Sequence, residues 1–261
     1  MTAARDRPPI QAFWCRIPSR ANFGDALTPW LIRRIAGVDP IFVRPRDPHP
    51  KHIAVGSIIA YAACGDTVWG AGIMAATDFI PPGAHLLAVR GPLTRARALA
   101  CGADCPEIYG DPALLLPRLH QPPARDREGV GLVAHFSDRP RLGDVWGKTP
   151  GVRPIDIQGG IETVIDQIAA SRFVASSSLH GLIVSHAYGV PAVWIKFRDL
   201  PSGDDSKFRD YYLSLDETPP EPLPVTYDRA DPDLLAERAT LPMVRPDLDR
   251  LWRACPFRGA G

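Results

Sequence analysis

The chain has 261 residues, 45% of them hydrophobic and 23% charged, so it can bury a full core and disorder is not expected. Its 30 basic side chains nearly balance 29 acidic ones, which argues against non-specific nucleic-acid binding. No apolar run approaches the roughly 18 residues of a membrane span, and the N-terminus lacks the apolar segment of a signal peptide. We therefore expect a cytoplasmic protein, with at most peripheral contact at the inner membrane.

The first half of the chain alternates apolar strands with amphipathic helices. Residues 22–36 carry Leu27, Leu31 and Ile35 at helical spacing, and Gly37 follows as a stop signal. A second helix is predicted over 91–103, with a proline in its first turn. Strands are predicted at 41–43, 52–59, 67–72 and 85–90, and the segment 107–117 is expected to start as a strand and to close the first half.

The second half repeats this pattern after a polar, proline-rich segment, 120–129, which we interpret as a linker. Strands alternating with helices indicate parallel sheets covered by helices on both faces. We therefore predict an α/β protein with two Rossmann-like domains, 1–120 and 129–230, facing a cleft as in a GT-B-like fold, and a C-terminal helical tail over 231–261. The strands predicted in this half are 129–136, 152–157, 172–176 and 191–197, and the helices are 161–171 and 179–189.

The segment SSSLHGLIVSHAYGVP, 176–191, places three serines and a histidine where a buried strand turns into a helix. In open α/β sheets, ligands bind beyond the carboxyl ends of the strands. Ser177 or Ser178 can cap the helix, or an anion can take the same backbone N–H groups. Gly181 would let a ligand approach the backbone. His180, in the first turn, is suited to act as an acid toward an anionic substrate. The alternative is an ordinary capped helix whose histidine touches solvent.

Five short motifs follow one another in a specific order and spacing. They are N-F-G-D (22–25), V-W-G-A-G (68–72), V-R-G-P-L-T-R (89–95), G-D-P-A (110–113) and the segment 171–191. Together they resemble the polysaccharide pyruvyltransferase family over about residues 20–215. The last segment is most similar to the branch that adds pyruvate ketals to bacterial exopolysaccharides such as succinoglycan.

The resemblance implies a GT-B-like fold, with phosphoenolpyruvate between two Rossmann-like domains, a histidine acid and arginines that hold the donor. The family histidine falls on His180, the first-domain arginine on Arg90, and a backbone contact to the donor on Leu179. Many members have arginine two residues before the histidine, where this chain has Ser178. This difference leaves open which cation takes over that charge.

The repeated K-F-R-D sequence, at 196–199 and 207–210, offers candidates for the missing cation. Lys196 and Arg198 follow a predicted strand, and Lys207 begins a predicted helix; a solvated loop is the alternative. Further candidate binding residues come from the motifs: Asn22, Gly24, Gly70, Gly72, Ser177, Ser178 and Gly181.

The implied chemistry matches these residue types. Phosphoenolpyruvate carries a carboxylate and a phosphate, which call for guanidinium groups and backbone N–H groups. An acid must protonate the methylene carbon or the leaving oxygen, and a base would assist the sugar hydroxyl; Asp25 is the candidate base, although it equally suits a helix N-terminus. The expected partners are phosphoenolpyruvate and a sugar acceptor, for which a lipid-linked oligosaccharide is one form. No cofactor, metal or nucleic acid is expected.

Two rival functions stay open at this point. One is a GT-B-type glycosyltransferase that uses a sugar nucleotide, although no paired glutamates flank a glycine-rich loop in the second half. The other is a non-catalytic binding relative, which Ser178 favours and which His180 and Arg90 disfavour.

Overall fold

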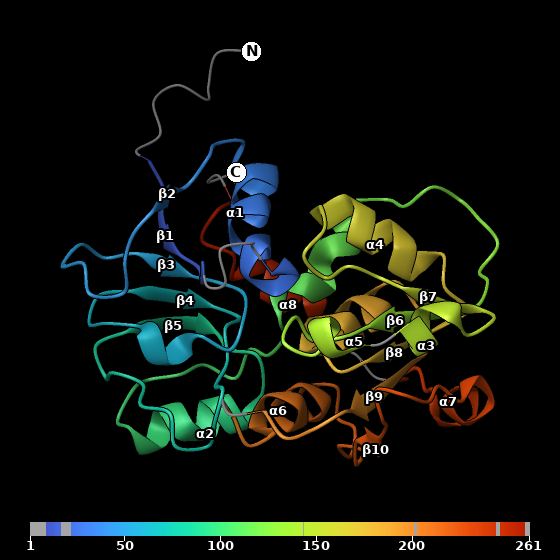
Figure 1. Cartoon of the computed structure of the whole chain (residues 1–261). Coiled ribbons are helices and arrows are strands. Elements are labelled where there is room, and N and C mark those ends of the chain that lie inside the picture. Colours follow the sequence, from blue (N-terminus) through green and yellow to red (C-terminus); the bar gives the residue numbers. More distant parts are fainter. Residues whose placement is uncertain (1–8, 17–21, 143, 201–202, 244–245, 259–261) are drawn as a thin grey trace. The chain divides into compact units, whose positions relative to one another are not determined.

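The computed structural model describes residues 9–16, 22–142, 144–200, 203–243 and 246–258 (Figure 1). These form two compact units. Unit 1 is drawn from Met1–Pro112, Ser202–Thr218 and Val244–Gly261, and unit 2 from Ala113–Pro201 and Pro219–Met243. This division differs from the expected domain ranges, because the chain returns to unit 1 at 202–218 and again at its end.

Unit 1 is built on a five-stranded sheet in the order β2-β1-β3-β4-β5, in which every pairing is parallel (Figure 1). Its strands are β1 (Gln11–Phe13), β2 (Ile41–Phe42), β3 (His52–Ile53), β4 (Thr67–Trp69) and β5 (His85–Ala88). Its helices are α1 (Phe23–Ala36), η1 (Ile59–Tyr61), α2 (Pro92–Ala100), α6 (Ser206–Ser214) and α8 (Leu248–Arg253).

The predicted helix over 22–36 is confirmed as α1. Leu27 and Leu31 are fully buried, as their helical spacing requires, and Gly37 ends the helix in the left-handed conformation at φ 72°. The core of unit 1 gathers apolar side chains from the strands and from α2, including Ile53, Val68 and Leu86. The indole N–H of Trp69 donates to the carbonyl of Leu251 at 2.9 Å, which fixes α8 to this unit.

Unit 2 is a second all-parallel sheet, in the order β10-β9-β8-β6-β7. Its strands are β6 (Val130–Val133), β7 (Val152–Pro154), β8 (Phe173–Ser176), β9 (Ala192–Lys196) and β10 (Leu223–Pro224). Its helices are η2 (Pro112–Arg118, which begins at the unit boundary), η3 (Arg139–Arg141), α3 (Asp144–Lys148), α4 (Ile161–Ala169), α5 (Leu179–Ala187) and α7 (Pro232–Arg238). Two parallel sheets with helices confirm the α/β class, whereas the GT-B-like cleft stays a prediction.

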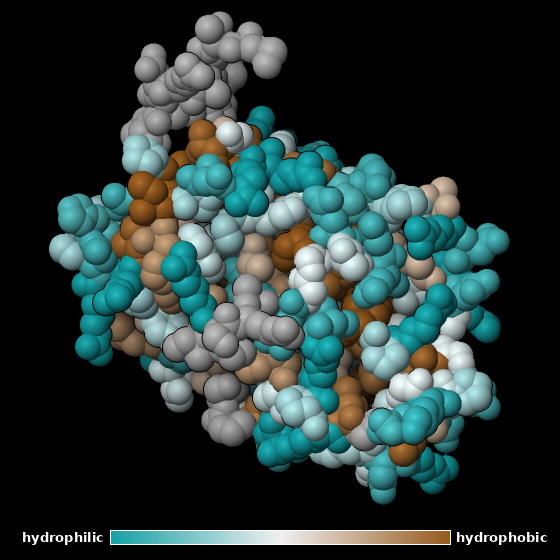
Figure 2. Space-filling view, turned by 45° about the horizontal axis from the view of Figure 1, so that its top comes forward, coloured by the Kyte–Doolittle hydropathy of each residue, from teal (hydrophilic) through white to brown (hydrophobic). Residues whose placement is uncertain are grey.

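Helix α5 is buried on every side, including His180 and His186. Six of its nine residues are apolar or glycine, which is typical of a helix inside a protein, and the polar His180, Ser185 and His186 are buried with them. On the face shown in Figure 2, hydrophilic side chains cover most of the surface and hydrophobic ones form small patches, in keeping with apolar cores inside the two units. No helix in the described part of the chain combines the length and apolar character of a membrane span.

One predicted strand is wrong beyond its first residues, and another is reduced to a single bridge. The strand expected over 52–59 ends at Ile53, because Gly56 adopts φ 111° and the Val55 amide bonds to the hydroxyl of Thr28. The strand expected at the start of 107–117 is a single parallel bridge between Val89 and Tyr109, and a 3-10 helix begins at Pro112.

The expected helical tail over 231–261 is two separate short helices. Helix α7 belongs to unit 2 and α8 to unit 1, so these pieces pack in different units. Residues 120–129, which we interpreted as a linker, have no helix or strand, and β6 begins directly after them at Val130. Strands β1 and β10 and helix α3 are short elements that the periodicity did not indicate.

Candidate functional site

The polar turn between β8 and α5 lies at the carboxyl edge of the unit 2 sheet. Ser178 is the N-cap residue of α5, but neither it nor Ser177 caps the helix with its side chain, so the predicted capping is wrong. Ser176 bonds this turn instead. Its hydroxyl accepts the Ser178 amide at 3.1 Å and lies 2.7 Å from the Ser178 carbonyl. The Ser176 hydroxyl therefore stabilises the turn, whereas the Ser177 hydroxyl donates to Asp138.

Gly181 serves packing in this structure rather than ligand approach. A Cβ at this position would lie 2.2 Å from Ser176 Oγ and 2.8 Å from Val133 Cγ1. The missing side chain therefore faces the strands of its own unit, and it allows the first turn of α5 to lie close against β6 and β8.

We expect Gly181→Ala to lower the free energy of unfolding by about 1–3 kcal/mol, because overpacking forces backbone shifts in a dense core. Urea denaturation would measure this change. Gly147→Ala is the matched control in the same unit, since its new Cβ would come no closer than 3.7 Å to the Pro154 ring. Equal stability of the two variants would contradict the packing role.

His180 and Leu179 occupy the first turn of α5, directly after the polar turn. Both are buried, and His180 keeps 8% of its surface exposed. An imidazole in the first helical turn, at the carboxyl edge of a parallel sheet, is placed where open α/β proteins bind ligands. This position suits a proton donor toward an anion bound at that edge.

A buried carboxylate that the sequence prediction missed organises the same edge. Asp138 accepts hydrogen bonds from Ser177 Oγ at 3.2 Å and from the hydroxyl of Tyr227 at 3.1 Å, and its Oδ1 lies 3.1 Å from Arg198 Nε. We call these four residues the Asp138 cluster. The sequence signal for this carboxylate was H-F-S-D, 135–138, in which three of four residues are polar at the end of a predicted strand.

Lys196 and Arg198 take different partners at the end of β9. The ammonium of Lys196 lies 2.6 Å from Oδ1 of Asp199, and this hydrogen bond lowers the pKa of the Asp199 carboxyl. Arg198 belongs to the Asp138 cluster, with its side chain 25% exposed. The two predicted cations therefore follow one strand but differ in the carboxylates they contact.

Arg90 is fully buried in unit 1, and its guanidinium has three partners there. It donates to Asp210 Oδ2 at 3.0 Å, to the hydroxyl of Ser57 at 2.8 Å and to the carbonyl of Ile73 at 2.6 Å. Gly72 lies against this group, since a Cβ there would come within 2.4 Å of Arg90 Cζ. The expected arginine directed toward a donor is thus a buried ion-pair partner.

Gly70 likewise has a packing role. It adopts φ 83°, and a Cβ there would lie 2.3 Å from Pro112 Cδ. The glycine lets the segment around Pro112 lie directly against the end of β4. Two of the four glycines predicted to bind substrate, Gly70 and Gly72, are therefore accounted for by contacts within unit 1.

The start of α1 gathers the N-F-G-D residues. Asp25 lies in the first turn, where a carboxylate complements the helix dipole, and it accepts a hydrogen bond from the side-chain amide of Asn22 at 3.3 Å. Gly24 is buried between them.

Lys207, in the first turn of α6, is a buried cation close to two other predicted residues. Burial, and next the charge of Arg90, lower its pKa to about 8, and the carboxylates of Asp205 and Asp25 oppose this shift. Lys207, Arg90 and Asp25 come from distant segments, and unit 1 brings them into one electrostatic neighbourhood.

The lowered pKa predicts how stability depends on pH. The folded state holds Lys207 neutral more readily than the unfolded chain, so the penalty for its charge is present below pH 8. It disappears as pH rises from about 8 toward 10.5. We expect Lys207→Met to gain about 3 kcal/mol of unfolding free energy at pH 7, and this gain should shrink above pH 8. Urea denaturation at several pH values would test this, with exposed Lys148→Met as control. A gain that does not vary with pH would contradict it.

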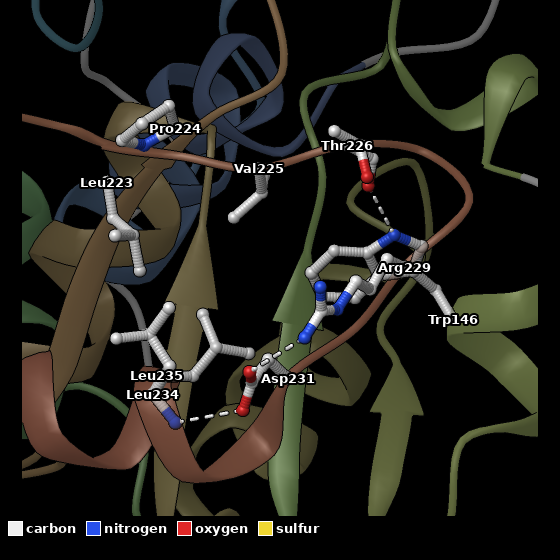
Figure 3. Close-up of a pocket in the computed structure, with 9 residues that line it drawn as sticks. All are labelled: Trp146, Leu223, Pro224, Val225, Thr226, Arg229, Asp231, Leu234 and Leu235. Atoms are coloured by element: carbon white, nitrogen blue, oxygen red, sulfur yellow. Dashed lines mark hydrogen bonds and ion pairs between the residues drawn. The ribbon is translucent and has the colours of Figure 1, made fainter.

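A separate pocket of about 240 Å³ lies in unit 2 between β10 and α7 (Figure 3). Trp146 and Leu235 form apolar walls, and Arg229 and Asp231 lie on its rim, 3.7 Å apart. None of the predicted site residues lines this pocket. Within the described ranges, no group of three or more His, Cys, Asp or Glu side chains could hold a metal ion.

Comparisons with known proteins agree with the motif order. An uncharacterised protein of Acanthamoeba polyphaga mimivirus is 27% identical over 201 residues, which cover 73% of this chain and 69% of that protein. No solved structure matches the chain significantly. The family model described as polysaccharide pyruvyl transferase matches residues 22–197, a range that runs from the start of α1 through β9 and holds Arg90 and His180. Because this match covers well over half of its length, the chain belongs to the polysaccharide pyruvyl transferase family.

Proposed function

We propose that the protein transfers a pyruvyl group from phosphoenolpyruvate to a sugar of a bacterial exopolysaccharide, with release of phosphate. The family membership supports transfer to a polysaccharide. The amino-acid sequence of residues 171–191 supports the branch that acts on exopolysaccharides such as succinoglycan. We place the reaction in the cytoplasm, with peripheral contact at the inner membrane where the acceptor is lipid-linked.

The reaction joins two sugar hydroxyls to one carbon. The first hydroxyl oxygen adds to C2 of phosphoenolpyruvate, C3 takes a proton from an acid, and the hydroxyl proton goes to a base. Phosphate then leaves C2 with the electrons of the C–O bond, the second hydroxyl oxygen bonds to C2 in its place, the proton of that hydroxyl passes to the released phosphate, and the product is a cyclic ketal. The developing positive charge at C2 makes proton delivery to C3 the step for which an enzyme needs an acid.

The single observation that carries the proposal is the place of His180. It lies in the first turn of α5, at the carboxyl edge of β8, within the matched range. We assign the acid role to His180 and a backbone contact with the donor to Leu179. The Ser178 amide and the Ser177 hydroxyl, which bond Ser176 and Asp138, support the turn. Asp25 stays the proposed base.

The geometry of unit 1 changes the role that we propose for Arg90. A guanidinium that is fully buried and bonded to Asp210, Ser57 and Ile73 supports the fold around it. Arg90 is therefore proposed to position the start of α2 and α6 rather than to contact the donor directly.

Release of inorganic phosphate from phosphoenolpyruvate, in the presence of lipid-linked oligosaccharide, is the decisive test. Mass spectrometry of the acceptor should detect the added pyruvyl ketal, and the His180→Gln variant should lack it. Turnover of a sugar nucleotide instead would establish the rival glycosyltransferase. Binding of phosphoenolpyruvate without turnover would establish a non-catalytic relative.

A further inference from the structure

The Asp138 cluster joins the segments that follow four neighbouring strands of unit 2. Asp138 follows β6, Ser177 follows β8, Arg198 follows β9 and Tyr227 follows β10. These strands are adjacent and parallel, so their carboxyl ends lie on one edge of the sheet. The Asp138 carboxylate, only 2% exposed, therefore fixes the positions of Ser177, Arg198 and Tyr227 relative to one another at the carboxyl edge of the unit 2 sheet.

Arg198 is held at several points around this carboxylate. Its Nε lies 3.1 Å from Asp138 Oδ1, and its Nη2 donates to the hydroxyl of Ser137 at 2.9 Å. The preceding residue, Phe197, stacks on Tyr227 with ring centroids 4.7 Å apart and planes inclined by 9°. A long, flexible side chain is thereby restricted to one orientation before any ligand binds, which reduces the entropy lost on binding.

The outer end of the same guanidinium is available to a ligand. A quarter of the Arg198 side chain is exposed, and its Nη1 contacts the carbonyl of Asp199 at 3.4 Å, the outer limit of a hydrogen bond. An anionic oxygen would replace that long contact with a shorter, charge-assisted one. The fork geometry of guanidinium suits a carboxylate or a phosphate, whereas a lysine supplies only a point charge.

Ser177 connects this cation to the segment that carries His180. Its hydroxyl donates to Asp138 Oδ2 and accepts the amide of His135 at 2.9 Å. Ser177 also precedes the first turn of α5 by only one residue, Ser178. The carboxylate of Asp138 therefore holds the cation and the turn before the imidazole in a fixed arrangement on one sheet edge.

We propose that Arg198 is the cation of unit 2 that binds the anionic donor, and that Asp138 is a positioning residue that holds Arg198 and Ser177 for this task. The inference rests on the proposed function and decides between the predicted cations. Lys196 already contacts Asp199 at 2.6 Å, and Lys207 is buried in unit 1.

The first experiment separates donor binding from chemistry. In Arg198→Lys, we expect KM for phosphoenolpyruvate to rise about 10- to 100-fold, as for loss of a charged hydrogen bond, with kcat nearly unchanged. Calorimetry should show a matching loss of affinity for phosphoenolpyruvate and for inorganic phosphate. Lys148→Gln, which removes an exposed positive charge from α3, is the control and should leave both values unchanged.

The second experiment tests the positioning role of Asp138. Asp138→Asn and the milder Tyr227→Phe should each raise KM with little change in kcat. Asp138→Asn combined with Arg198→Gln should raise KM no more than Arg198→Gln alone, because both act through the same guanidinium. Thermal unfolding of each variant identifies any that fail to fold, and Tyr227→Phe, which removes one hydroxyl, keeps the test available.

The outcomes distinguish this inference from the proposed function. If the wild-type protein releases no phosphate from phosphoenolpyruvate, but affinity for phosphoenolpyruvate falls in Arg198→Lys, the proposed reaction is overturned and the anion site is supported. Normal turnover by wild type, with unchanged KM and affinity in Arg198→Lys and Asp138→Asn, would overturn the anion site and support the reaction.

Discussion

His180→Gln should lower kcat for phosphate release by about 100- to 10,000-fold, the usual contribution of a general acid. Glutamine keeps a hydrogen-bond donor of similar size but cannot transfer a proton. Because His180 is buried, thermal unfolding should first verify that the variant folds. Affinity for phosphoenolpyruvate, measured by calorimetry, should change little, so the loss should fall on kcat.

The same helix offers a matched control for this prediction. His186 is also buried in α5, but it lies in the last turn, away from the carboxyl edge of β8. His186→Gln should therefore leave kcat close to that of wild type once its folding has been verified by thermal unfolding. Nearly full activity in His180→Gln would reduce the segment 176–180 to a structural strand–helix turn.

Asp210→Ala should lower the free energy of unfolding by about 3–5 kcal/mol, because it leaves the buried charge of Arg90 without its carboxylate. Asp210 also serves α2, where it accepts the backbone amide of Thr94 at 2.9 Å and its hydroxyl at 2.6 Å. The N-cap residue of α2 is Gly91, which has no side chain for this purpose. The carboxylate from α6 therefore caps α2 from outside.

Two further variants separate charge from geometry at this buried pair. Arg90→Lys keeps the charge but cannot reproduce the contacts to Ser57 and the Ile73 carbonyl, so we expect a loss of about 1–3 kcal/mol. Arg209→Ala, an exposed neighbour of Asp210 on α6, is the control and should change stability by less than about 0.5 kcal/mol. Urea denaturation measures all three; equal losses in Asp210→Ala and Arg209→Ala would contradict the role of the buried pair.

Local patterns were sufficient to predict most of the regular structure. The helical spacing of Leu27 and Leu31 and the stop at Gly37 predicted α1, and the apolar runs around 173–176 and 192–196 predicted β8 and β9. These predictions succeed because side-chain periodicity follows directly from the geometry of a helix or strand. The strand expected at the start of 107–117 is only one bridge, because apolar content alone does not reveal that Gly110 adopts φ 132°.

Local patterns also predicted only part of the candidate site at the β8–α5 turn. The sequence indicated His180 and the polar turn before it, since serines and a histidine after a buried strand are a local signal. It could not indicate which serine bonds the turn. That role falls to Ser176, because its hydroxyl reaches the Ser178 amide while Ser177 points to Asp138.

By itself, the sequence determined the alternation of strands and helices, the α/β class and the position of the histidine at a strand end, because each follows from residues that are close together in the chain. Only the tertiary structure decided the partners of the charged groups. Arg90 meets Asp210 across 120 positions, and Arg198 meets Ser137 across 61. Such pairings depend on the order of the strands within each sheet and on the packing of helices within each unit, and no local pattern encodes that order.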